Sequence, residues 1–120
     1  MKSKLLVPMA LAFLALAAPA AFAHTHVRTT SIADNAVLAS APAKFTVAFT
    51  EPAAIANVTL ATGAAAPAPL NYTPPPGFAA SYQIPLPHLD AGAYTLGWRM
   101  IARDGHVMNG VVHFTVHPAP

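Results

Sequence analysis

The sequence contains no cysteine. Without a thiol the chain is unable to form a disulfide, which many small exported domains use to compensate for a small core. The same absence excludes a thiolate metal site. Any bound metal must therefore be held by nitrogen, oxygen or thioether ligands.

Charged side chains are also scarce, at 8% of the residues. Two of the six cations, Lys2 and Lys4, lie in an N-terminal segment that we expect to be removed. The remainder holds four cations (Arg28, Lys44, Arg99, Arg103) and four anions (Asp34, Glu51, Asp90, Asp104), so its net charge is zero with neutral histidines. The sequence pI of about 9.3 therefore does not indicate a nucleic-acid partner. All six histidines lie after that segment.

The N-terminal segment has the pattern of a secretory signal peptide. Lys2 and Lys4 precede an apolar stretch over 5–16, and the small residues over 20–23 include the cleavage motif Ala21-Phe22-Ala23. The apolar stretch is shorter than the roughly 18 residues that a membrane span needs. We therefore predict a signal peptide over 1–23 and a mature domain over 24–120, which is 120 − 23 = 97 residues. The alternative, an uncleaved anchor, would leave His24 inside the chain.

Regular alternation of apolar and polar residues predicts strands through the rest of the chain. The expected strands cover 24–29, 44–50, 55–62, 80–86, 92–103 and 111–116, and Glu51-Pro52 is expected to end the second, because proline does not continue a ladder. Prolines at 67, 69, 74, 75 and 76 predict a long loop over 62–77 with a short strand at 69–72. Only residues 31–40 hint at a helical period. About seven short strands predict an all-β domain, a β-sandwich without a disulfide.

The single tryptophan is expected at the centre of the core. Trp98 shares a strand face with Tyr94, Leu96 and Met100 by the two-residue period. We expect six apolar side chains to pack around its indole ring: Phe45, Val47, Phe49, Leu96, Phe114 and Val116.

A candidate metal site follows from the predicted cleavage. His24 would become the first residue, so its free amine and its imidazole could close one chelate ring on a metal. Cu(II) favours tetragonal sites of nitrogen and oxygen and binds imidazole well. One more imidazole would complete the T-shaped arrangement called a histidine brace. The turn Asp104-Gly105-His106 offers that imidazole and a carboxylate on the same side.

A second site competes for the same amine. Because His26 is the third residue after cleavage, Cu(II) could be wrapped by the amine, two deprotonated backbone amides and the His26 imidazole without any fold. His26 could also be a further ligand of the brace or an ordinary surface residue. Asp104 could likewise be only a turn former, and His88, His113 and His117 are expected at the surface.

Together these features resemble the CopC family of periplasmic copper-resistance proteins. The resemblance is carried by the N-terminal histidine, Phe-Thr-Glu-Pro at 49–52, Tyr-Thr-Leu-Gly-Trp-Arg at 94–99, and Asp-Gly-His at 104–106 followed by Gly-x-x-x-Phe at 110–114. It covers residues 24–120 and implies a small Greek-key β-sandwich of the immunoglobulin-like or cupredoxin-like β-barrel kind. It also implies that His24, Asp104 and His106 bind Cu(II), with Glu51 nearby as a weak ligand or as an acceptor that orients a histidine.

One departure from the resemblance concerns methionine. Some members of the family carry a methionine-rich loop that binds Cu(I), whereas residues 62–77 of this chain contain no methionine. After cleavage only Met100 and Met108 remain. The sequence therefore resembles the Cu(II)-only type, with one Cu(II) per mature chain.

The leading functional hypothesis is a periplasmic Cu(II) carrier that is not an enzyme. The resemblance implies copper as its ligand and a CopD-like inner-membrane protein as its partner, and we expect a monomer that does not span the membrane after cleavage. One alternative is a structural β-sandwich assembly subunit, which would not explain the terminal histidine. Another is a copper oxidative enzyme with the same brace, but the aromatic residues are expected to face inward and leave little platform for a substrate.

Overall fold

The computed structural model describes Ser3 and residues 25–118. Seven strands form the fold: β1 Val27–Thr30, β2 Ala36–Leu38, β3 Lys44–Thr62, β4 Ala68–Pro69, β5 Ala79–Pro85, β6 Gly92–Ala102 and β7 Val107–Val116. The described part contains no helix, so the predicted all-β class is confirmed and the helical hint over 31–40 is wrong; that stretch contains β2. Nothing in the described part is therefore a helix able to cross a membrane. The predicted leader, apart from Ser3, and His24 lie outside the described residues.

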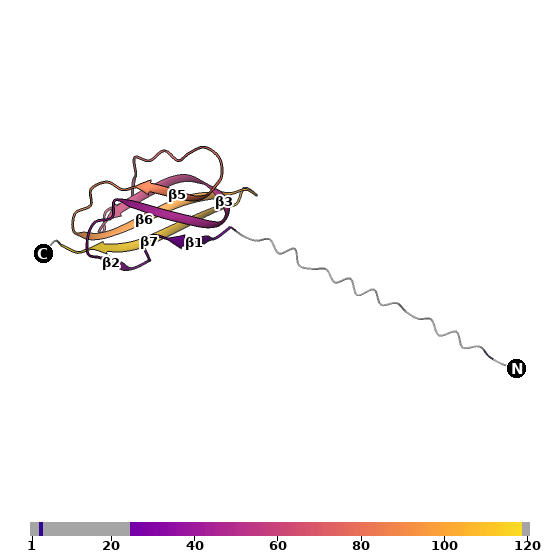
Figure 1. The fold of residues 1–120 in the computed structure, drawn as a ribbon, viewed down its shortest axis with the longest axis horizontal. Coiled ribbons are helices and arrows are strands. Elements are labelled where there is room, and N and C mark those ends of the chain that lie inside the picture. The colour runs from indigo at the N-terminus through magenta and orange to yellow at the C-terminus, as the bar shows by residue number, and fades with distance from the viewer. Residues whose placement is uncertain (1–2, 4–24, 119–120) are drawn as a thin grey trace.

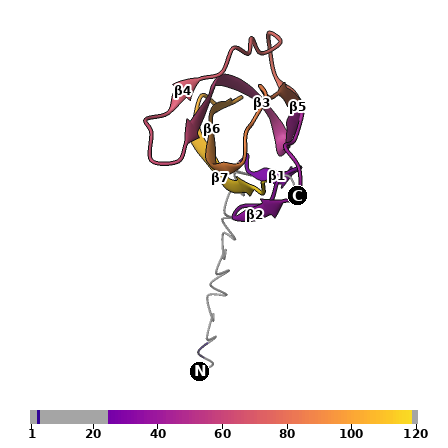
Figure 2. The ribbon, with the colours of Figure 1, turned by 90° about the vertical axis from the view of Figure 1, so that its left-hand side faces the viewer.

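The strands form one sheet that curls on itself, in the order β1-β3-β6-β7-β2, with β4 and β5 added on β3. The first half of β3, residues 44–48, pairs with β5, and residues 47–49 pair with β1. The second half, from Ala53 to Thr62, pairs with β6, and it also carries β4. Because β3 belongs to both layers, the strands surround a common interior, as Figure 2 shows in the view along the sandwich. The predicted β-sandwich is confirmed.

The prediction that Glu51-Pro52 ends a strand is wrong, since β3 runs through both residues. In the described ladders neither residue has a Cα partner: the β5 register jumps from Ala48 to Ala53, and pairing with β6 begins at Ala53. Proline lacks the N–H that a central ladder position needs, and at this crossing between layers no donor is required. The two predicted strands are therefore one strand with an unpaired bend.

The predicted core is confirmed. Trp98 is 4% exposed, and the six side chains expected around it are all in the same buried cluster. Its ring lies 5.4 Å from that of Phe45, centroid to centroid, which joins the two layers through β6 and β3. The Trp98 Nε1–H has no hydrogen-bond partner among the described residues, so packing is what the indole contributes. The rings of Tyr94 and Phe114, which belong to the same buried cluster, stack on each other with their centroids 5.5 Å apart.

Candidate metal centre

The Asp104-Gly105-His106 sequence forms the tight turn between β6 and β7. The Ala102 N–H donates to the His106 carbonyl at 2.8 Å, and the Gly105 N–H donates to the Ala102 carbonyl at 2.9 Å. Gly105 has φ +89°, a left-handed conformation in which a residue with a Cβ would be strained. The glycine therefore lets the chain reverse within three residues, and this keeps Asp104 and His106 adjacent.

The Asp104 carboxylate contacts His106 twice. Oδ1 accepts the His106 main-chain N–H at 3.0 Å, and Oδ2 lies 2.7 Å from His106 Nδ1. The main-chain hydrogen bond, followed by the one from the ring, lowers the pKa of Asp104 below its usual value of 3.8. The carboxylate is therefore an anion near neutral pH, and an anionic oxygen suits Cu(II).

The separation of 2.7 Å between Oδ2 and Nδ1 also fits the geometry of a metal chelate. Two metal–ligand bonds of about 2.0 Å at a right angle place their donor atoms about 2.8 Å apart. The two atoms therefore already have the separation that a chelate requires; binding of a metal ion would release the proton between them to water and turn both lone pairs toward the metal. Both side chains are accessible, at 71% for His106 and 53% for Asp104.

The start of β1 and the bend of β3 lie at the same end of the sandwich as this turn. Ala53 pairs with Ala102, at the end of β6, while Thr50 and His26 are hydrogen-bonded three residues earlier. Figure 1 shows β1 beginning at the end where the β6–β7 hairpin turns. Glu51 stands between these two contacts on the unpaired part of β3, with an exposed side chain.

The chain just after His24 is held firmly. His26 donates its main-chain N–H to Thr50 Oγ1 at 2.9 Å, and the Thr50 N–H donates to the His26 carbonyl at 2.8 Å. Thr25 is only 6% exposed although its side chain is polar. The residue that follows His24 in sequence is therefore packed against this end of the domain.

Of the predicted site residues, the structure brings Asp104 and His106 into direct contact and places Glu51 and His26 at the same end. His24 lies outside the described residues, so the predicted set of His24, Asp104 and His106 stays a prediction. Within residues 25–118, no three His, Asp or Glu side chains are grouped closely enough to hold a metal ion.

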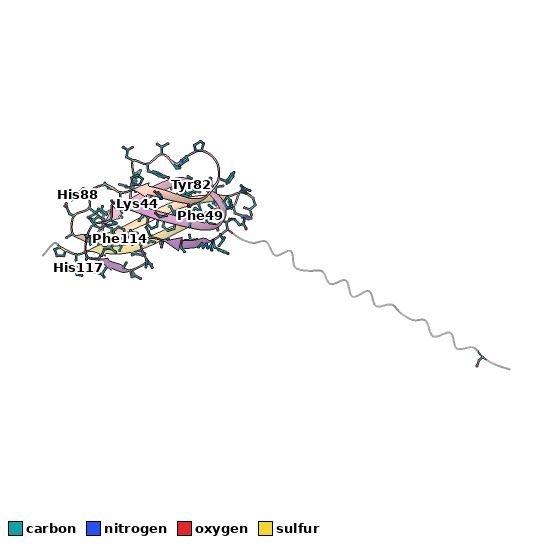
Figure 3. All side chains as sticks on the ribbon, in the orientation of Figure 1. Lys44, Phe49, Tyr82, His88, Phe114 and His117 are labelled. Carbon is teal, nitrogen blue, oxygen red and sulfur yellow. The ribbon has the colours of Figure 1, made fainter. Side chains whose placement is uncertain are left out.

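The remaining histidines are exposed, as expected, and lie elsewhere. Figure 3 shows His88 and His117 together at the opposite end of the sandwich. His88 Nε2 lies 3.1 Å from Asp90 Oδ1. On β7, the His113 N–H and Nδ1 contact Asp34 Oδ1 at 2.8 and 2.9 Å.

Two features at the end of the sandwich that carries the Asp104–His106 turn were not predicted from the sequence. Thr50 was only the last position of the strand expected over 44–50, and a contact with His26 across 24 positions leaves no local pattern. Phe78 is 48% exposed, and the Arg103 guanidinium lies 5.8 Å from its ring centroid. The sequence signal is the glycine before Phe78. Gly77 has φ +90° in the structure, and a turn at this glycine leaves the Phe78 side chain exposed.

Comparisons with known proteins agree with this fold. Residues 27–117 match the family model of the CopC domain. PcoC of Escherichia coli, described as a methionine-rich copper resistance protein, is 30% identical over 78% of this chain and 99% of its own, with a TM-score of 0.56. CopC of Methylosinus trichosporium has a TM-score of 0.68 at 19% identity, over 81% of this chain and 97% of its own. A search of curated proteins found no match.

Proposed function

The chain belongs to the CopC family, and on that basis we propose that it binds one Cu(II) ion and carries or buffers it for copper resistance. The binding site is a histidine brace formed by the amine and ring of His24 after cleavage, the imidazole of His106 and a carboxylate oxygen of Asp104. Because the leader has the features of a signal peptide, we place the mature protein in the periplasm.

The observation that carries this proposal is the contact between Asp104 and His106. Its N–O distance of 2.7 Å suits two neighbouring copper ligands, and it occurs at the end where Thr25, the residue after His24, is buried. We propose that Glu51, which is exposed on the unpaired bend of β3 at the same end, acts as a weak ligand or orients a histidine. The ligands are nitrogen and oxygen, which suits Cu(II).

The carrier role separates this chain from an oxidative enzyme with the same brace. The six aromatic side chains expected to face inward, at 45, 49, 82, 94, 98 and 114, are buried. Phe78, which is 48% exposed, is the large aromatic side chain exposed at this end, and a single ring is too small a platform for a polymer. A coordination plane completed by Asp104 also leaves no open in-plane position for oxygen. We expect the copper-loaded protein to consume no oxygen with ascorbate beyond the rate of a copper-free control.

As its delivery partner we propose a CopD-like inner-membrane protein.

The test compares the two possible copper sites in the purified mature protein. His106→Ala should lower Cu(II) affinity by orders of magnitude, measured against a competing chelator, whereas His26→Ala should do much less. One extra residue before His24 should be as damaging as the loss of His106, because it converts the amine of His24 into an amide. Mass spectrometry of the exported protein should find His24 at its N-terminus. If His106→Ala is harmless and His26→Ala abolishes binding, the brace is wrong.

A further inference from the structure

We propose that Thr50 selects between the two copper-binding modes. Its hydroxyl holds the main-chain N–H of His26 and so opposes the site in which the N-terminal tail wraps Cu(II) by itself. The inference rests on the proposed function, because both modes require His24 to be the first residue.

The geometry shows a reciprocal pair of hydrogen bonds, which we term the Thr50–His26 clasp. The His26 N–H donates to Thr50 Oγ1 at 2.9 Å, and the Thr50 N–H donates to the His26 carbonyl at 2.8 Å. The clasp lies one residue before β1 begins at Val27. Burial of Thr25 at 6% exposure holds the preceding residue as well. Both amides that the tail site needs therefore belong to a packed segment.

The tail site is incompatible with this clasp for a chemical reason. In that mode Cu(II) is bound by the terminal amine, by the amide nitrogens of Thr25 and His26, and by the His26 imidazole. Each amide nitrogen gives its proton to water when it binds the metal, so two protons are released for each Cu(II). A metal-bound amide nitrogen has no hydrogen left to donate to Thr50 Oγ1. Copper in the tail site must therefore break the clasp.

The brace carries no such cost. Its donors are the amine and ring of His24 with Asp104 and His106, and none of them is a main-chain amide. The clasp remains intact when the brace forms, and it keeps the chain after His24 against β3. The hydrogen bond from the His26 N–H to Thr50 Oγ1 therefore disfavours the tail site and does not affect the brace.

The acceptor can be removed with little damage to the fold. It is a side-chain hydroxyl rather than a main-chain carbonyl, and Thr50 is exposed. Thr50→Val removes the acceptor and keeps the branched shape that suits a strand. Thr50→Ser keeps the acceptor and serves as the matched control.

The experiment is made in the His106→Ala background, where the brace is crippled and only the tail site competes for copper. Cu(II) affinity is measured against a competing chelator for three proteins: His106→Ala alone, and the same variant with Thr50→Val or with Thr50→Ser. We expect Thr50→Val to raise the affinity about two- to tenfold, the effect of freeing one ordinary hydrogen bond. The Thr50→Ser variant should match His106→Ala alone.

A spectroscopic readout identifies the mode. Four in-plane nitrogens, two of them anionic amides, give a stronger ligand field than the brace, so the visible d–d band of Cu(II) moves to shorter wavelength. We expect the wild-type protein to lack this band and the Thr50→Val, His106→Ala protein to show it. Further substitution His26→Ala should remove both the band and the gain in affinity.

The outcomes separate the two proposals. If His106→Ala weakens binding strongly but the valine and serine variants then bind Cu(II) equally, the role of Thr50 is wrong and the brace stands. A loss of affinity in the valine variant has the same meaning, because the clasp would then support tail binding. If the wild-type protein already shows the tail spectrum, the brace and the selection by Thr50 are both overturned.

Discussion

At the scale of single residues, the Asp104 carboxylate and the His106 imidazole, two positions apart in the sequence, are in direct contact with each other. The main-chain N–H and ring of His106 hold the Asp104 carboxylate and lower its pKa. The pair thus has both the charge and the spacing of two copper ligands. A second pair of the same residue types, His88 and Asp90, lies at the opposite end at 3.1 Å and provides an internal comparison.

We predict that Asp104→Asn lowers Cu(II) affinity by about 10- to 100-fold, because the substitution removes the anionic charge and replaces one of the two acceptor oxygens with an NH2 donor. Competitive titration measures the change. Asp90→Asn is the matched control, and its affinity should equal that of the wild type. Equal effects of the two substitutions would mean that Asp104 acts only through the net charge of the domain.

The residue-scale predictions from sequence succeeded where the spacing was local. Asp104 and His106 share a turn whose geometry Gly105 dictates, so their proximity follows from three consecutive residues. The Thr50–His26 clasp joins residues 24 positions apart and depends on how β1 meets the bend of β3. A pattern of alternating residues cannot contain that information.

At the scale of elements, β6 and β7 are fitted to each other by one missing side chain. Trp98 pairs with Gly110, and a Cβ on Gly110 would come within 2.2 Å of Trp98 Cε2. The indole therefore occupies the space that any other residue at 110 would fill. This contact explains why residue 110, the first position of the Gly-x-x-x-Phe motif at 110–114, is a glycine; the sequence alone did not explain it.

We predict that Gly110→Ala destabilises the domain by about 1 to 3 kcal/mol, because the central indole must move. For a domain of this size the melting temperature should fall by about 5 to 20 °C, as measured by thermal unfolding followed by circular dichroism. Gly97→Ala is the control, since its Cβ would meet the Thr59 hydroxyl at 3.0 Å, which can rotate away, and the Gly110 carbonyl oxygen at 3.8 Å, an ordinary van der Waals contact. If the two variants melt together, the indole is not confined at Gly110.

A second element-scale contact is the pair of Asp34 and His113, which ties the connection between β1 and β2 to β7. The main-chain N–H of His113, and then its ring, lower the pKa of Asp34 below 3.8. Since the folded pKa is depressed, the stabilisation is present above about pH 3.8 and is lost as the pH falls through the folded value. We predict that Asp34→Asn lowers the melting temperature at pH 6 and that the difference shrinks below pH 3.8. A constant difference from pH 6 to pH 2.5 would contradict a role for the charge.

The elements themselves were largely predictable, because half-buried strands alternate. The faces of the strands over 44–50 and 92–103 were assigned correctly for that reason. One exception was the stretch over 31–40, where a hint of helical period stood in place of β2, and another was Glu51-Pro52, which has the local pattern of a strand end. In the fold it is a bend where β3 leaves one layer for the other, and a bend without ladder partners tolerates a proline.

At the scale of the whole molecule, the two ends of the sandwich differ in their chemistry. The end with the β6–β7 turn holds the Asp104–His106 pair. The loop over 62–77 contains no methionine, so it offers no thioether to a metal at either end. The relative PcoC is described as methionine rich, whereas only Met100 and Met108 follow residue 23 here, and Met100 is buried in the core. A soft thioether site is therefore unsupported by the ligands available.

We predict one tight Cu(II) per mature chain and only weak binding of Cu(I). Titration of the purified mature protein under a Cu(I) chelator measures the second quantity, and the Cu(II) titration of the same sample is its control. Apart from the single half-buried thioether of Met108, the ligands outside the core are hard or borderline nitrogen and oxygen atoms, which hold Cu(I) poorly compared with sulfur. A Cu(I) stoichiometry of one at high affinity would contradict this reading of the loop.

The continuity of β3 through both layers also determines how the domain opens. β3 pairs with β1, β4, β5 and β6, so no layer can separate without breaking the strand that the other layer needs. Its ladder-bonded amides, which exclude the unpaired bend at 51–52, should exchange with deuterium only when the whole domain unfolds. A ligand at one end then slows exchange along all of β3, by about a thousandfold when free Cu(II) is 1,000 times its dissociation constant. The residues of β3 farthest from the metal should be protected as strongly as those beside it.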